Sequence, residues 1–309
     1  MRVVEKINGA ITKLMEEHKD LYILGEDILD PYGGAFKVTK GISTKFPKRV
    51  MTTPISEPSI VGFSSGMAMT GKKVIVEIMF GDFLALTFDQ IINQISKFMW
   101  IYNDISMPLI IRTPMGGGRG YGATHSQSIE KHFCGISGVK VLTINQYSNF
   151  YKIYSEALNS RKPTIIIENK VLYGKKAIDN YRNYSKQIPD IICITYGGSL
   201  DVCVESANEI NEIEEINTEV IPIETMSPFD HKMIKELSKR CKKFLFVEES
   251  GSGWGFSEMC KSSLIGVDGI KFSSVSGPNH PIPSSKDWEV NLLPNKPRIY
   301  KEIINLFNS

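Results

Sequence analysis

The sequence predicts an α/β fold with two domains, each built around a mostly parallel sheet. Short apolar runs typical of buried strands alternate with helical patterns along the chain. This alternation is typical of parallel sheets that helices cover on both faces. The 309 residues exceed the usual size of a single core, which favours two domains. A polar segment at residues 170–189 interrupts the alternation and indicates the boundary.

The predicted first domain covers residues 1–180. It begins with a helix whose apolar residues recur at helical spacing: Val4, Ile7, Ile11, Leu14 and Met15. Apolar runs then predict strands at residues 21–24, 74–79, 109–112, 139–143 and 164–168. Helical patterns lie near residues 58–70, 84–102 and 147–160.

The predicted second domain is smaller and covers residues 190–309. Its strands are expected at residues 191–196, 219–223, 244–248 and 270–273. Its helices are expected near residues 199–213, 230–241 and 254–265. A proline-rich loop at residues 278–283 then leads to a terminal helix from about Pro297.

The composition is that of an ordinary soluble globular protein, with 42% hydrophobic and 23% charged residues. The 36 basic and 34 acidic residues leave a net charge of +2 without long blocks of one sign, so no nucleic-acid partner is indicated. Charges interrupt the apolar residues of the first helix, so we expect neither a signal peptide nor a membrane span. The five cysteines lack zinc-site or redox-motif spacing, and we expect reduced thiols in a cytoplasmic protein.

A ligand site is expected in the loops that leave the predicted strands, because open parallel sheets bind ligands beyond the carboxyl ends of their strands. Glu26, Glu57, residues 80–83 and residues 116–125 all fall in such loops. Glu57 stands ahead of a small-residue helix, where it is a functional carboxylate, a helix N-cap or a solvated loop charge.

Residues 116–122 contain five glycines, which permit backbone geometry closed to other residues and a close approach to a ligand. No Walker or dinucleotide-binding pattern accompanies them, so nucleotide binding is not indicated. His125 ends this segment, where it is either a proton-transfer group or a structurally bonded or surface histidine.

Two further features favour structural roles. Arg112 ends an apolar strand and requires a carboxylate partner or a charged ligand, and an internal ion pair is favoured. The GDF sequence at residues 81–83 lacks the second glycine and the asparagine of a Gly-Asp-Gly metal motif. We therefore predict no metal site in this chain.

Ordered motifs connect the chain to a known family. They are LGED at 24–27, YGGAFKVTKG at 32–41, TPISE at 53–57, FDQIIN at 88–93, THSQ at 124–127, ENKVLYG at 168–174, TYGG at 195–198, VEE at 247–249 and HPIP at 280–283. With them, the chain resembles the beta subunit of thiamine-diphosphate-dependent 2-oxo acid dehydrogenases over essentially its whole length. The resemblance implies a transketolase-like pyrimidine-binding domain followed by a smaller transketolase-type C-terminal α/β domain.

The resemblance also implies a cofactor and partners. In this family the diphosphate domain, with its magnesium signature, belongs to a separate alpha chain. Thiamine diphosphate with Mg²⁺ is therefore expected to be held mainly by an alpha subunit, in an alpha2-beta2 heterotetramer. The implied reaction is decarboxylation of a small 2-oxo acid and transfer of the acyl group to lipoamide, with a lipoyl acyltransferase as a further partner.

The family's site residues carry over at four positions. Glu57 matches the glutamate that hydrogen-bonds the aminopyrimidine ring nitrogen and so makes the exocyclic nitrogen basic. Phe83 matches the aromatic residue that stacks on this ring, with core packing as its alternative role. Glu26 matches an acidic residue near the cofactor pocket. His125 matches a histidine on the substrate side, where it would assist proton or acyl transfer.

Apolar neighbours of Glu57, such as Ile55, Ile60 and Val61, are expected to enclose it and raise its pKa. Departures from the family pattern, in the residues after Glu57 and at residues 79–83, fall near the substrate end of the pocket. They leave open a carboligase or ketol transferase that uses the same cofactor. A non-catalytic structural partner that has kept the fold is a third possibility.

Overall fold

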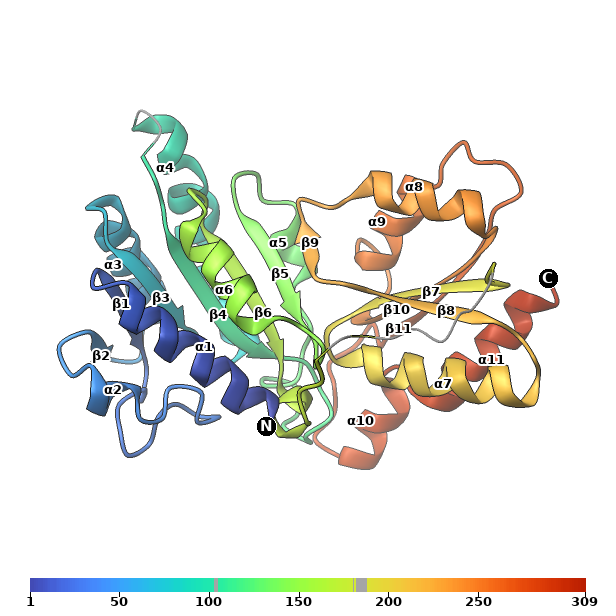
Figure 1. Cartoon of the computed structure of the whole chain (residues 1–309), viewed down its shortest axis with the longest axis horizontal. Helices are drawn as coiled ribbons and strands as arrows, with labels where there is room; N and C mark the ends of the chain where they lie inside the picture. The colour runs from blue at the N-terminus through green and yellow to red at the C-terminus, as the bar shows by residue number, and fades with distance from the viewer. Residues whose placement is uncertain (103–104, 180, 182–187) are drawn as a thin grey trace.

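The computed structural model describes residues 1–102, 105–179, 181 and 188–309. Within these residues the strands form two sheets, one in the order β2-β1-β3-β4-β6-β5-β9 and the other in the order β11-β10-β7-β8. Figure 1 shows the two sheets side by side, each flanked by helices. The strand pairings are parallel apart from that of β5 with β9. The predicted α/β fold is confirmed.

The first sheet contains the strands predicted in the first half of the chain and two short ones that were not predicted. Its strands are β1 (Leu21–Gly25), β2 (Val50–Thr52), β3 (Lys73–Glu77), β4 (Leu109–Met115), β5 (Lys140–Ile144), β6 (Thr164–Asn169) and β9 (Thr225–Ser227). Successive side chains on a strand point to opposite faces. In β4, for example, Ile110 packs toward one helical layer and Ile111 toward the other.

Helices cover both faces of this sheet. On one face α1 (Val3–Glu17) packs against α6 (Phe150–Asn159), and the apolar residues predicted to mark α1 are buried there (Figure 1). On the other face lie α3 (Glu57–Met69), the 3₁₀ helix η1 (Gly81–Thr87), the π-helix η2 (Gln90–Ile95), α4 (Ser96–Ile101) and α5 (Lys131–Cys134). The short helices α2 (Ile42–Lys45) and η3 (Lys170–Gly174) lie within loops.

The single helix predicted near residues 84–102 is wrong in detail, because this stretch is divided into η1, η2 and α4. Two hydroxyl groups bond to backbone carbonyls within it. Thr87 Oγ1 donates to Leu84 O at 2.8 Å, and Ser96 Oγ donates to Ile92 O at 2.8 Å. Such side-chain bonds compete with the regular helical ladder, in keeping with the change of helix type.

The second sheet follows the prediction closely. Its strands are β7 (Ile191–Tyr196), β8 (Thr218–Ile223), β10 (Lys243–Gly251) and β11 (Lys271–Gly277). On one face lie α7 (Leu200–Ile213) and α11 (Lys296–Phe307), and on the other lie α8 (His231–Arg240) and α9 (Phe256–Ser263). The helix α10 (Lys286–Leu292) was not predicted, and the 3₁₀ turn η4 (Gly197–Ser199) follows β7.

The two halves of the chain also contact each other through a strand pairing and a shared apolar core. Strand β9 comes from the second half but pairs antiparallel with β5 of the first sheet, at Val141 opposite Ser227. One apolar core cluster also contains residues of both sheets. The proposed boundary falls partly on residues 180 and 182–187, outside the described residues, so the division into 1–180 and 190–309 stays a prediction.

The described cysteines match the expectation of reduced thiols. All five are free, and all except the half-buried Cys134 are buried. In the described ranges, none of the helices combines the length and apolar character needed to cross a membrane.

Candidate active site

The four predicted site residues lie at one edge of the first sheet. Glu26 directly follows β1, and Glu57 follows β2 as the first residue of α3. Phe83 lies in η1 after β3, and His125 lies in the loop after β4. Because these strands are parallel neighbours, their carboxyl ends meet at the same edge.

Glu26 and Glu57 form a buried acid pair. Each is only 5% exposed. Burial, followed by the nearby charges of Glu57, Asp27 and Glu77, raises the pKa of Glu26, against a backbone hydrogen bond from Ser56. Among the described residues, Glu26 Oε1 is buried without a hydrogen-bond partner. The pair therefore offers an unsatisfied buried acceptor, or a proton when Glu26 is neutral.

The start of α3 excludes two of the roles considered for Glu57. Ser56 is the N-cap residue, so Glu57 is not the cap, and its burial excludes a solvated loop charge. The proline in the first turn favours the start of a helix here. The positive end of the helix dipole then stabilises the Glu57 carboxylate in the same turn.

One expectation about this carboxylate is wrong. Ile60 and Val61 are buried as predicted, but Ile55 is 84% exposed. It lies in the turn between β2 and α3, where its side chain faces outward instead of enclosing Glu57.

Aromatic rings surround His125. The Phe83 ring centroid lies 5.2 Å from that of His125, and the Phe80 centroid lies 4.6 Å from it, both edge to face. Phe80 also contacts Phe83 at 5.7 Å and Tyr121 at 6.1 Å. The Thr124 hydroxyl lies 2.8 Å from His125 Nδ1. The half-buried imidazole is thus oriented by ring packing and by one polar neighbour.

The glycine-rich loop, residues 116–125, needs its glycines for both conformation and space. Gly116 has a φ of +88°, and a Cβ there would lie 2.5 Å from Asn169 Nδ2. Gly122 has a φ of +76°, and a Cβ there would lie 2.4 Å from Ser284 Oγ. Side chains at these positions would be strained and would clash, so glycine permits the close packing of this loop.

Two transketolase domain families match the chain. The pyrimidine-binding domain of transketolase matches residues 1–176, and the C-terminal domain of transketolase matches residues 181–299.

Relatives that match most of the chain identify its family more closely than the two domain families do. The chain is 31% identical to the pyruvate dehydrogenase E1 component subunit beta of Chlorokybus atmophyticus, over 90% of this chain and 87% of that protein. It is also 31% identical to the 2-oxoisovalerate dehydrogenase subunit beta of Bacillus subtilis, over 81% of this chain and 79% of that protein. The chain belongs to the thiamine-diphosphate-dependent 2-oxo acid dehydrogenase beta subunits. The family predicted from the ordered motifs is confirmed.

Other comparisons agree with this beta subunit assignment. The acetoin:2,6-dichlorophenolindophenol oxidoreductase subunit beta of Cupriavidus necator is 29% identical, over 95% of this chain and 93% of that protein. A split-gene transketolase, solved as an inactive beta4 tetramer, shares the fold at a TM-score of 0.79 and 18% identity. The alignment covers 100% of this chain and 99% of that chain.

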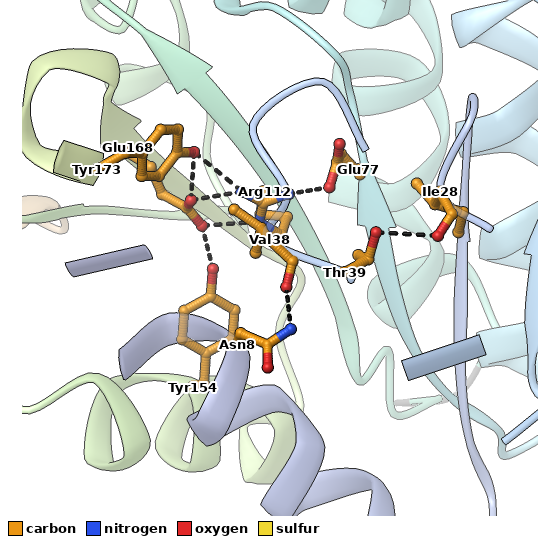
Figure 2. A network of polar contacts seen from close by, with 9 residues as sticks. All are labelled: Asn8, Ile28, Val38, Thr39, Glu77, Arg112, Tyr154, Glu168 and Tyr173. Carbon is orange, nitrogen blue, oxygen red and sulfur yellow. Dashed lines mark hydrogen bonds and ion pairs between the residues drawn. The ribbon is translucent and has the colours of Figure 1, made fainter. Parts of the chain in front are cut away.

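Figure 2 shows a buried network of the beta subunit in which Arg112 lies between Glu77 and Glu168. The Arg112 guanidinium donates to Glu168 from Nε at 2.8 Å and from Nη2 at 2.5 Å, and Nη1 pairs with Glu77. Tyr173 OH donates to Glu168 at 2.6 Å, and Tyr154 OH also donates to this carboxylate. Burial raises the pKa of Glu77, with Arg112 opposing the shift. The predicted internal ion pair is confirmed.

This network also supports the loop that carries Glu26. Gly34 packs so tightly on Glu77 that a Cβ would lie 2.8 Å from its Oε1. Nearby, Asn8 Nδ2 donates to Val38 O at 2.6 Å, and Thr39 Oγ1 donates to Ile28 O at 3.0 Å (Figure 2). These contacts give the glycine-containing motif at residues 32–41 a physical role in fixing the loop.

Sequence reasoning missed several buried charges of the beta subunit. Lys170, Glu130 and Glu289 are buried, and Glu249 is half-buried. Lys170 directly follows β6, but the polar Glu168 and Asn169 separate it from the apolar residues 165–167, so it lacks the pattern that marked Arg112 as a buried charge. In the described part of the chain, no group of three or more His, Cys, Asp or Glu side chains is placed to hold a metal ion.

A small cavity of about 20 Å³ lies between the two halves, lined by Gly116, Asn169, Tyr196, Glu130 and Glu249 among others. Its volume matches about one water molecule. Glu130 accepts a hydrogen bond from Tyr196 OH. Burial is the main cause that raises the pKa of Glu130 to about 7.

Glu130→Gln is expected to reduce the pH dependence of unfolding. The pKa of Glu130 rises from 4.5 to about 7 on folding, so its stabilising contribution is complete below pH 4.5 and is lost as the pH rises through about 7. Glutamine resembles the protonated acid but does not titrate. Urea unfolding across this pH window measures the effect, with the exposed Glu236→Gln as a control. An unchanged slope in Glu130→Gln would contradict the assignment.

Proposed function

We propose that this beta subunit, assembled with an alpha subunit, decarboxylates a small 2-oxo acid with thiamine diphosphate and transfers the acyl group to lipoamide. The observation that carries the proposal is the buried Glu26–Glu57 pair at the strand ends, with one carboxylate oxygen unpartnered among the described residues. The relatives are named for pyruvate, 2-oxoisovalerate and acetoin enzymes. They therefore support the shared cofactor chemistry but do not favour any one substrate.

The site fits the aminopyrimidine end of the cofactor. Thiamine diphosphate supplies a carbon nucleophile and an electron-accepting ring for decarboxylation. Glu57 would hold the aminopyrimidine ring nitrogen, and the unpartnered oxygen of Glu26 would accept a further hydrogen bond nearby. Phe83 would stack on the ring, which contributes about 0.5–1.5 kcal/mol beyond area burial.

His125 would act on the substrate side of the same site. Its ring is packed against Phe80 and Phe83, and its half-buried position leaves it able to exchange a proton. We assign it proton transfer, or assistance to acyl transfer onto lipoamide.

An alpha subunit would hold the diphosphate and Mg²⁺ in an alpha2-beta2 heterotetramer. Exposed apolar side chains on α3, η1 and α4 support a partner surface here: Phe63, Leu86, Trp100 and Ile101. Trp100 is 74% exposed, and large exposed apolar groups on neighbouring elements are typical of interfaces. A lipoyl acyltransferase would be a further partner, and the free thiols favour the cytoplasm.

Reconstitution with the alpha subunit tests this function. The pair, supplied with thiamine diphosphate and Mg²⁺, is expected to form acyl-lipoamide from a 2-oxo acid in a panel of pyruvate and branched-chain substrates. Mass spectrometry of a lipoyl domain measures the product. Transfer to an aldehyde without a lipoyl requirement would instead favour a carboligase. A confirmed complex that gives no calorimetric heat with the cofactor would favour a structural partner.

A further inference from the structure

Lys170 is a buried charge that the proposed function does not use. It is 0% exposed and is the first residue of η3, directly after β6. An ammonium group removed from water is costly unless other groups solvate it. Its contacts therefore indicate what the protein gains from a lysine here.

Lys170 forms hydrogen bonds with two residues of the glycine-rich loop, Arg119 and His125. Its Nζ donates to the backbone carbonyl of His125 at 2.6 Å. Its own carbonyl accepts from Arg119 Nη2 at 2.8 Å. One residue thus holds the loop before Tyr121 and again at His125 itself.

The ammonium also faces the aromatic residues around the imidazole. Lys170 Nζ lies 5.6 Å from the centroid of the Phe80 ring and 6.0 Å from that of Tyr121. Phe80 in turn contacts His125 edge to face at 4.6 Å. A cation over an aromatic face is attracted by the ring, so Lys170 contacts both the backbone and the ring packing of the site histidine.

Two acids from the second half hold the rest of the loop. Gly120 N donates to Glu289 at 2.6 Å, and Gly117 N donates to Glu249 at 3.3 Å. Burial lowers the pKa of Lys170 to about 8, while Asp82, Glu249 and Glu289 oppose this shift. Charged side chains of opposite sign, those of Lys170, Glu249 and Glu289, therefore bind the backbone of the loop.

We propose that Lys170 is a positioning residue that sets the backbone at His125 and thereby holds the imidazole against Phe80 and Phe83. The inference rests on the proposed role of His125. Lys170 acts through the loop, because its buried ammonium already donates to the His125 carbonyl. Methionine has a similar length but donates no hydrogen bond, so it removes this restraint while filling most of the space.

Lys170→Met is expected to lower kcat of the reconstituted enzyme by about 10²-fold, the size of effect that a small misplacement of a catalytic group produces. KM for the 2-oxo acid and affinity for thiamine diphosphate should change much less. Lys131→Met is the matched control, since Lys131 Nζ also donates to backbone carbonyls, those of Gly251 and Gly253, neither of which belongs to the glycine-rich loop.

A double-mutant cycle separates positioning from general stability. In the His125→Ala background, Lys170→Met is expected to add no more than about a twofold loss, because both changes remove the same contribution. An equal loss in both backgrounds, or an effect no larger than that of Lys131→Met, would overturn the inference. Full turnover in His125→Ala alone would instead refute the proposed role of His125, and the inference with it.

If the methionine variant does not assemble, Lys170→Gln replaces it in the cycle under the same criteria. The glutamine side chain stays polar beside the neighbouring acids, but it is shorter than lysine and does not reach as far toward the His125 carbonyl. Thermal unfolding of each complex confirms that the compared enzymes are folded.

Discussion

Glu57→Gln is expected to lower kcat of the assembled enzyme by about 10²–10⁴-fold, the usual contribution of a positioned acid or base. The glutamine has nearly the same shape and keeps the packing at the start of α3, where Glu57 is buried. It cannot exchange a proton with the aminopyrimidine ring. Steady-state turnover on the reconstituted pair measures the loss, and circular dichroism checks the fold.

Glu130→Gln is a matched control for this experiment, because it makes the same substitution at another buried glutamate, one that is not among the four predicted site residues. It should leave turnover near the wild-type value. Full activity in Glu57→Gln would refute the central role given to this carboxylate.

Arg112→Met is expected to destabilise the protein by about 3–5 kcal/mol, the cost of breaking a buried pair by removing one partner. The substitution leaves Glu77 and Glu168 buried without their shared cation. Tyr154 and Tyr173 continue to donate to Glu168, but Glu77 loses its charged partner. Urea unfolding of the variant measures the change in the free energy of unfolding.

Arg240→Met provides the comparison for Arg112→Met. The exposed Arg240 pairs with the half-buried Glu219, and an ion pair near the surface is worth about 0–1 kcal/mol. Similar losses in the two variants would show that the Arg112 network contributes no more than a surface ion pair.

The strands with strong apolar runs were predictable because their burial on both faces leaves an unbroken apolar sequence. Strands β2 and β9 were not predicted, since each has only three residues and β9 pairs with a strand far away in the chain. Such pairing depends on tertiary contacts that local patterns do not contain.

The candidate site was predictable to the level of one sheet edge. Apolar runs predicted the strands that precede Glu26, Phe83 and His125, and Glu57 was expected ahead of a helix, whereas the role of each residue came from the family resemblance. The buried charges that support the loop were not predictable in the same way. Lys170 has the sequence context of a loop residue, and its contacts are with residues distant in the sequence, such as His125 and Phe80.

The pairing of β9 with β5 has a consequence for how the gene can be divided. A fragment that ends before residue 225 would leave the edge of β5 bare, with unpaired backbone groups open to another chain. The second half of the chain therefore covers the edge of the first sheet with β9, in addition to forming the second sheet. A gene fusion that carried only the first half into another protein would expose this edge and favour aggregation, whereas the intact chain keeps the edge paired.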